Sequence, residues 1–166
     1  MKTKELNTIR KTSLLFIVCL VLSGITAFPL RSELAYLMAH RTELTPTLQH
    51  WIELLHTVIN QTPDIVLYGT DWLAFAHLII ATFFIGVYMD PVKNKFIVQV
   101  GMMACLAVFP LAFICGPIRG IPFFHQLIDC SFGVIGLIPL SIIYRNIKML
   151  ELRGAAQVKS VAPTLS

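Results

Sequence analysis

This chain of 166 residues is too apolar for an ordinary soluble domain: 56% of its residues are hydrophobic and 13% are charged, whereas soluble domains average about 25% charged residues. Its formal net charge is +4, but the basic residues flank apolar runs and form no stripe interleaved with aromatic residues, which excludes a nucleic-acid partner. The length suits one compact bundle rather than several domains.

The chain begins with a polar segment, residues 1–12, which we expect to be a cytoplasmic tail. Residues 13–30 (SLLFIVCLVLSGITAFPL) carry no charge and form the first expected span. A basic flank and the small residue Ala27 resemble a signal peptide, but Ile25 breaks the small-residue cleavage pattern. We therefore expect a retained anchor.

Residues 31–69 form the only long polar segment, and they read as two short helices. Ser32 and Thr45 are expected to cap these helices, and Pro46 fits a first helical turn. The segment is expected to lie over the bundle or along the membrane surface. Its three histidines are interpreted as surface residues: His40, His50 and His56.

Three further apolar runs follow the outer segment. The four expected spans are residues 13–30, 70–89, 96–115 and 122–144. Thr70 or Asp71 is expected to cap the start of the second span. A short turn, residues 116–121, joins the last two spans, and residues 153–166 form a second cytoplasmic tail.

The predicted fold is an all-α integral membrane four-helix bundle with a short extracytoplasmic helical segment, residues 31–69, between spans 1 and 2. Residues 13–152 form its single four-span domain.

The distribution of Lys and Arg predicts the orientation, because these residues concentrate on the cytoplasmic side. With the N-terminus inside, ten of the thirteen basic residues fall inside: Lys2, Lys4, Arg10, Lys11, Lys93, Lys95, Arg145, Lys148, Arg153 and Lys159. Arg31, Arg41 and Arg119 fall outside. We therefore expect a multi-pass protein of the cytoplasmic (plasma or inner) membrane, with both termini in the cytoplasm.

The stretch Gly116 to Gly136 (GPIRGIPFFHQLIDCSFGVIG) places ionisable residues in an apolar helix. At 100° per residue, His125, Asp129 and two glycines fall within about 80° of arc. Ionisable groups in such a helix usually face the protein interior, and small residues mark the close approach of another helix. The orientation brings six groups to the outer end of the bundle: Asp71, His77, Cys115, Arg119, His125 and Asp129.

One interpretation of this outer cluster is structural. Arg119 would pair with Asp71 or Asp129, His125 would bond to Asp129, and a backbone carbonyl would satisfy His77. The protein would then be a structural or accessory membrane protein, or a ligand-binding module.

Two catalytic alternatives stay open, so the sequence does not decide whether the protein is an enzyme. In the first, His77, His125 and Asp129 hold a divalent metal ion such as Zn²⁺ or Fe²⁺. In the second, His77 or Asp129 acts as a base and Arg119 binds an anionic group of a lipid or another membrane-associated substrate.

A b-type haem held by His77 and His125 is disfavoured, because His77 lies about two turns into its span and His125 lies within one turn of the start of its own. Proton passage along the polar face is a further alternative. Expected partners are the lipid bilayer and either a membrane-protein partner or further copies of this chain.

Overall fold

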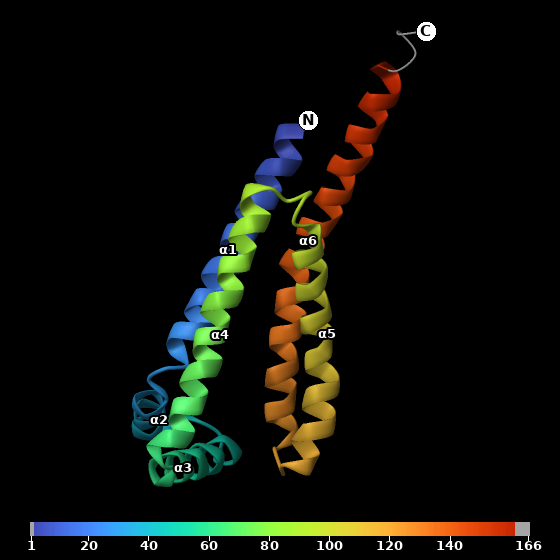
Figure 1. The fold of residues 1–166 in the computed structure, drawn as a ribbon. Coiled ribbons are helices and arrows are strands. Elements are labelled where there is room, and N and C mark those ends of the chain that lie inside the picture. Colours follow the sequence, from blue (N-terminus) through green and yellow to red (C-terminus); the bar gives the residue numbers. More distant parts are fainter. Residues whose placement is uncertain (1, 162–166) are drawn as a thin grey trace. The chain divides into compact units, whose positions relative to one another are not determined.

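The structure is a computed structural model that describes residues 2–161, and all its regular structure within that range is helical. The elements are α1 (Lys2–Thr26), α2 (Leu30–Ala39), the short 3₁₀ helix η1 (Arg41–Glu43), α3 (Pro46–Gln61), α4 (Asp64–Met89), α5 (Lys95–Ile118) and α6 (Phe123–Val161) (Figure 1). Four described helices, α1, α4, α5 and α6, are long and apolar enough to cross a membrane. The all-α fold class with four candidate spans and a helical segment between the first two is therefore confirmed.

The first helix is displaced from its expected position toward the N-terminus. It already begins at Lys2, so the polar segment 1–12 is helical from that residue onward. Lys, Glu and Arg are good helix formers, and they extend an apolar helix at little cost. The helix ends at Thr26, short of the expected residue 30, because Pro29 disfavours helical geometry in the residue before it.

The expected cap of the second span is wrong. The helix α4 begins at Asp64, and the carbonyl oxygen of Pro63 accepts hydrogen bonds from the amides of Val66 and Leu67. Thr70 and Asp71 therefore lie inside α4, where the Thr70 hydroxyl donates to the Leu67 carbonyl at 2.6 Å. The helix extends back to Pro63 because proline tolerates the N-terminal boundary of a helix, where no amide partner is needed.

The last two helices also exceed their expected lengths. The helix α5 continues to Ile118, into the expected turn, and α6 continues to Val161. The expected C-terminal tail, residues 153–166, is thus helical as far as Val161. Residues 1 and 162–166 of the two expected tails lie outside the described residues.

The chain divides into two compact units, so the single domain over residues 13–152 stays a prediction. Unit 1 combines Met1–Val18 with Ala81–Ser166, and unit 2 is Cys19–Ile80. Each of the long helices α1 and α4 contributes one part to unit 1 and the other part to unit 2.

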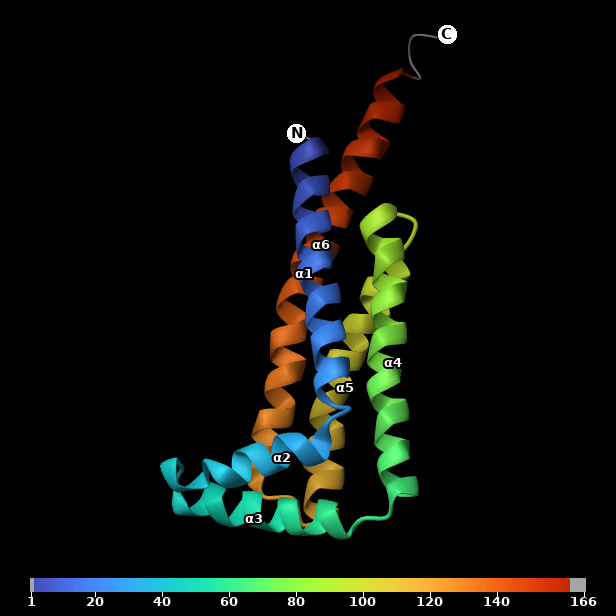
Figure 2. The same cartoon turned by 90° about the vertical axis from the view of Figure 1, so that its left-hand side faces the viewer.

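Unit 1 packs parts of all four long helices around an apolar core. Its large apolar side chains that are fully or almost fully buried are Ile9, Phe84, Val87, Val98, Leu140, Ile143 and Ile147. Helices α5 and α6 run side by side in both views (Figures 1 and 2). They approach closely at Gly133, where a Cβ atom would lie 2.6 Å from the backbone oxygen of Cys105. Small residues permit such approaches between membrane helices.

One end of unit 1 carries charged contacts between its helices. The Arg153 guanidinium of α6 pairs with Glu5 of α1, and Lys95 of α5 pairs with Glu151 of α6 at 2.8 Å. The Arg10 guanidinium of α1 lies 5.7 Å from the centre of the Tyr88 ring of α4. These contacts bring the N-terminal end of α1, the α4–α5 turn and the C-terminal part of α6 to the same end (Figure 1).

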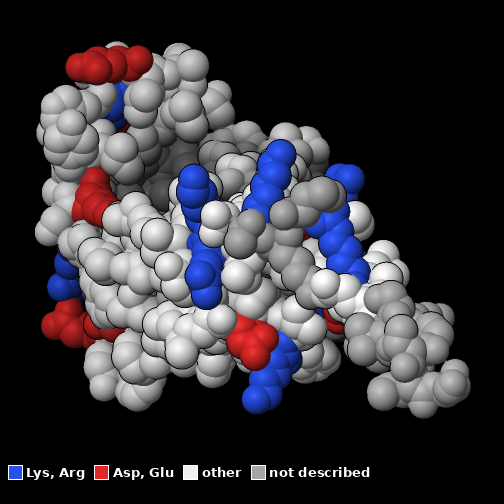
Figure 3. Space-filling model, turned by 90° about the horizontal axis from the view of Figure 1, so that it is seen from above, with Lys and Arg blue, Asp and Glu red and all other residues white. Residues whose placement is uncertain are grey.

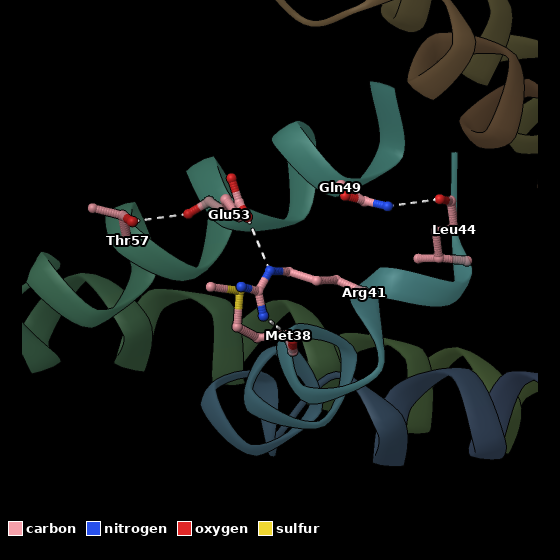
Figure 4. Close-up of polar contacts among 6 residues, drawn as sticks. All are labelled: Met38, Arg41, Leu44, Gln49, Glu53 and Thr57. Atoms are coloured by element: carbon pink, nitrogen blue, oxygen red, sulfur yellow. Dashed lines mark hydrogen bonds and ion pairs between the residues drawn. The ribbon is translucent and has the colours of Figure 1, made fainter. Parts of the chain in front are cut away.

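Unit 2 contains an antiparallel hairpin of α2 and α3 (Figure 2). Arg41 holds the two helices together: Nε donates to Glu53 Oε1 at 2.9 Å, and Nη1 donates to the carbonyl oxygen of Met38 at 2.9 Å (Figure 4). Pro46 occupies the first turn of α3, as expected, but the Thr45 side chain makes no capping hydrogen bond.

The expected cap of α2 is wrong, because Ser32 lies inside the helix. The helix begins at Leu30, and Pro29 occupies its N-cap position. The early start follows from the geometry of proline, whose fixed φ suits the entry to a helix.

Candidate functional site

A cavity of about 470 Å³ lies within unit 2, where the α1–α2 turn meets the beginning of α4. Its lining residues are Phe28, Pro29, Leu30, Arg31, Ser32, Asp64, Leu67, Tyr68, Thr70 and Asp71. The turn is forced by Pro29, and α4 presents its first two helical turns to the cavity. The cavity therefore combines one cation, two carboxylates and several apolar side chains.

Arg31 joins the start of α2 to the segment that leads into α4. Its Nη1 lies 2.8 Å from Asp64 Oδ1, and its Nη2 donates to the carbonyl oxygen of Thr62 at 3.0 Å. The Asp64 side chain is 87% exposed, and ion pairs this exposed contribute at most about 1 kcal/mol to stability. The pair therefore positions the cavity wall more than it stabilises the unit.

Asp71 differs from the other two charged residues of the cavity. Its side chain is half-buried, and no described residue forms a hydrogen bond or an ion pair with its carboxylate. Because Arg31 and Asp64 neutralise each other, Asp71 leaves the cavity lining with one negative charge in excess. A half-buried carboxylate without a partner favours a cationic or hydrogen-bonding ligand.

An apolar groove of about 300 Å³ adjoins the cavity and shares Phe28, Tyr68 and Asp71 with it. Trp72 and Phe75 complete its lining. The ring centres of Tyr68 and Trp72 are 6.1 Å apart, and those of Trp72 and Phe75 are 6.2 Å apart, both in edge-to-face geometry. Four of these residues, Tyr68, Asp71, Trp72 and Phe75, are hereafter the α4 stripe.

The α4 stripe could have been found from sequence. Its members follow the spacing i, i+3, i+4, i+7, which places them on one face of a helix. An expected span that begins at residue 70 leaves Tyr68 outside the helix, and for this reason the face was not predicted.

His77 lies on α4 within unit 2, close to α1. Its Nδ1 lies 2.9 Å from the backbone oxygen of Leu73, so the expectation that a backbone carbonyl satisfies His77 is confirmed. A Cβ atom at Gly24 of α1 would lie 3.2 Å from the Cβ atom of His77 and 2.9 Å from the Ala74 oxygen. His77 therefore stands where two helices approach closely.

His125 and Asp129 lie together on α6 within unit 1, as their spacing predicts. His125 Nε2 is 3.9 Å from Asp129 Oδ1, which is too long for the direct hydrogen bond that we expected. Their side chains are 35% and 46% exposed. The reason is that the α6 face buried at this level is that of Gln126 and Cys130, next to the face of His125 and Asp129.

Arg119 follows α5 and carries an exposed side chain that forms no ion pair with any described residue. The expected pairing with Asp129 is therefore not made. Cys115, the remaining member of the expected cluster, is an exposed free thiol near the end of α5.

The turn after α5 is a Schellman motif. Gly120 has a φ of 68°, the Ile121 amide donates to the Gly116 oxygen, and the Gly120 amide donates to the Pro117 oxygen. A glycine with positive φ and these two hydrogen bonds terminate a helix. Glycine adopts this positive φ without steric cost because it has no Cβ atom.

Gln126 is a structural residue that the sequence analysis missed. Its side chain is 4% exposed, and Nε2 donates to the Ile121 oxygen at 2.8 Å. Its Cδ would lie 2.7 Å from a Cβ atom at Gly116. The pairing of a glycine with a glutamine ten residues later is a tertiary contact, and no periodic pattern in the sequence signals it.

Among residues 2–161, no three His, Cys, Asp or Glu side chains gather closely enough to hold one metal ion. His77 belongs to unit 2, whereas Cys115, Arg119, His125 and Asp129 belong to unit 1. The residues expected to be catalytic or metal-binding stay predictions, and the built cavity lies around Asp71 instead.

Comparison of the chain with protein-family models, with curated proteins and with solved structures finds no match.

Proposed function

We propose that this chain is a multi-pass protein of the cytoplasmic membrane that binds an amphipathic ligand at its outer side, in the cavity and groove of unit 2. The observation that carries the proposal is the continuity of the two spaces. A cavity lined by Arg31, Asp64 and Asp71 adjoins an almost wholly apolar groove. Small-molecule sites combine apolar walls with a few convergent polar groups in this way.

The orientation in this proposal is supported by the charges of unit 1. The charges that support it lie at the end of unit 1 formed by the N-terminal part of α1, the α4–α5 turn and the C-terminal part of α6. The Lys and Arg residues of that unit whose side chains are described, Arg119 apart, belong to these segments: Lys4, Arg10, Lys11, Lys93, Lys95, Arg145, Lys148 and Arg153. Figure 3 looks down on this end and shows Lys and Arg side chains projecting from it. Such enrichment is typical of the cytoplasmic side.

The lining of the cavity favours binding over catalysis. Neither histidine nor cysteine is among its lining residues. The Arg31 guanidinium already pairs with Asp64 and donates to the Thr62 carbonyl oxygen. Its charge is therefore neutralised within the protein, which disfavours a role in stabilising an anionic transition state. The cavity with its charged residues suits the polar end of an amphiphile, and the adjoining groove suits its apolar end.

Filling the cavity tests the proposal. Ser32 is exposed at the cavity wall, and the variant Ser32→Trp is expected to occupy space that a ligand needs. We expect the amount of amphiphile that co-purifies with the protein in a mild detergent to fall by about tenfold, which corresponds to about 1.4 kcal/mol of lost binding free energy. Solvent extraction followed by mass spectrometry measures the ratio of amphiphile to protein.

The matched control is Thr57→Trp, on an exposed position of α3 that does not line the cavity. This variant adds the same side chain to the same unit, and it should retain the amphiphile of the unmodified protein. Equal retention by both variants, or no defined amphiphile in the unmodified protein, would contradict the proposed function.

The orientation is tested separately by thiol labelling of intact cells. In a background without the four native cysteines, Thr57→Cys should react with a membrane-impermeant maleimide added outside. Lys93→Cys, in the α4–α5 turn, should react only after the membrane is permeabilised. The reverse pattern would place the cavity on the cytoplasmic side.

A further inference from the structure

We infer that the ligand is a membrane lipid whose headgroup carries an ammonium group, and that the α4 stripe binds this group through Asp71 and the flanking aromatic rings. The inference rests on the proposed function and names the chemical class of its ligand. Three features of unit 2 support it: the arrangement of the rings, the excess negative charge and the lateral opening of the groove.

The rings form adjoining walls rather than a flat layer. Tyr68 and Trp72 meet at an interplanar angle of 80°, and Trp72 and Phe75 meet at 90°. Perpendicular rings leave a corner in which a cation can lie over at least one aromatic face. Organic ammonium groups are recognised by aromatic side chains arranged in this manner.

The charge of the site selects the sign of the ligand. Asp71 belongs to the stripe and lies in both the polar cavity and the groove. Its carboxylate is the excess charge of the cavity, because Arg31 and Asp64 form a pair. An anionic headgroup at this point would meet an unpaired carboxylate, whereas an ammonium group would neutralise it.

The groove opens on the flank of a candidate membrane span. Trp72 is 59% exposed and Tyr68 is 55% exposed, and α4 is apolar enough to cross a membrane. A ligand therefore reaches the site from the lipid phase, with its acyl chains along α4 and its headgroup at Asp71. Tyr and Trp are also the residues enriched at the headgroup level of bilayers.

Tryptophan fluorescence tests the inference directly, because the chain has two tryptophans. In the variant Trp51→Phe, Trp72 of the stripe is the remaining reporter. The protein is reconstituted in bilayers in which a lipid with brominated acyl chains, a quencher, is titrated against its unbrominated form. Separate titrations use phosphatidylcholine, phosphatidylethanolamine and phosphatidylglycerol with the same chains, and they yield relative association constants at Trp72.

We expect the two ammonium lipids to be preferred over phosphatidylglycerol by about threefold or more. Asp71→Asn should abolish the preference, Asp71→Glu should retain most of it, and Phe75→Leu should reduce it. The control Asp90→Asn makes the same change in the α4–α5 turn, where Asp90 Oδ1 accepts a hydrogen bond from the Lys93 amide, and it should leave the preference unchanged. The melting temperature of each variant separates lost selectivity from lost folding.

Equal quenching by all three lipids in the unmodified stripe would overturn the inference, and so would a preference for phosphatidylglycerol. Neither result contradicts the proposed function, which is tested by the co-purification experiment because that experiment detects any amphiphile in the cavity. Loss of that amphiphile in Ser32→Trp together with equal quenching would mean that the cavity binds a ligand of another class.

Discussion

Replacement of Gly133 by alanine is expected to lower the free energy of unfolding of unit 1 by about 2 kcal/mol, because overpacking a well-packed contact costs 1–3 kcal/mol. The added Cβ atom would lie 2.6 Å from the backbone oxygen of Cys105 and 3.4 Å from the Phe109 ring. A backbone oxygen inside a helix cannot move aside as a flexible side chain can. The steric clash with the Cys105 oxygen is therefore removed only if α5 and α6 move apart.

Labelling of buried Cys130 measures this effect. Cys130 is 6% exposed, so its thiol reacts with a maleimide mainly when unit 1 opens. Titration with SDS in mixed micelles, followed by peptide-level quantification of Cys130 labelling, yields the midpoint of unfolding. We expect the midpoint to shift to a lower SDS fraction in Gly133→Ala.

The matched control is Gly69→Ala. A Cβ atom at Gly69 would have no heavy atom within 4 Å outside its own helix and chain neighbours, so the variant gains only the helix propensity of alanine, about 1 kcal/mol at most. An unchanged midpoint in Gly133→Ala would show that α5 and α6 do not approach at this glycine.

The second large effect is expected at Gly116 and Gln126, which should be energetically coupled. Gly116→Ala places a Cβ atom 2.7 Å from Gln126 Cδ, and Gln126 cannot swing away without losing its hydrogen bond to the Ile121 oxygen. We expect a loss of about 1–2 kcal/mol from this clash. Gln126→Ala alone should cost about 1 kcal/mol for the lost hydrogen bond.

The double variant Gly116→Ala, Gln126→Ala should be more stable than the sum of the two single effects predicts, because removal of the glutamine side chain removes the clash. The same Cys130 labelling assay measures all three variants. Neighbouring residues that share a contact typically show coupling energies of 0.5–3 kcal/mol. Additive effects would argue against the contact, and the pair Gly69→Ala, Gln126→Ala serves as the additive reference.

The charged residues of the cavity were only partly predictable from the sequence. Asp71 was expected in a polar cluster, and it lines a cavity, but its charged neighbours there are Arg31 and Asp64. The expected outer cluster grouped residues from spans that are neighbours in sequence and from similar positions along those spans. The cavity depends on the ion pair between Arg31 and Asp64, which are separated along the chain by α2, η1 and α3. A contact between such distant residues leaves no local signal in the sequence.

His125 and Asp129 illustrate the complementary limit. Their spacing correctly placed them on one helix face, but a helical wheel does not state which face is buried. The side chain of Gln126 and the thiol of Cys130 occupy the buried face instead. The choice between adjacent faces depends on which of them meets Gly116 and α5, and that is a property of packing.

The sequence by itself determined the helical class, the four apolar helices and the segregation of basic residues, because each follows from composition or from a period along one helix. Only the tertiary structure decided the boundaries of the helices, the cavity around Asp71 and the close contacts at Gly133 and Gly116. These features depend on atoms from segments distant in the chain, whose distances are set by how whole helices pack and where prolines turn the backbone.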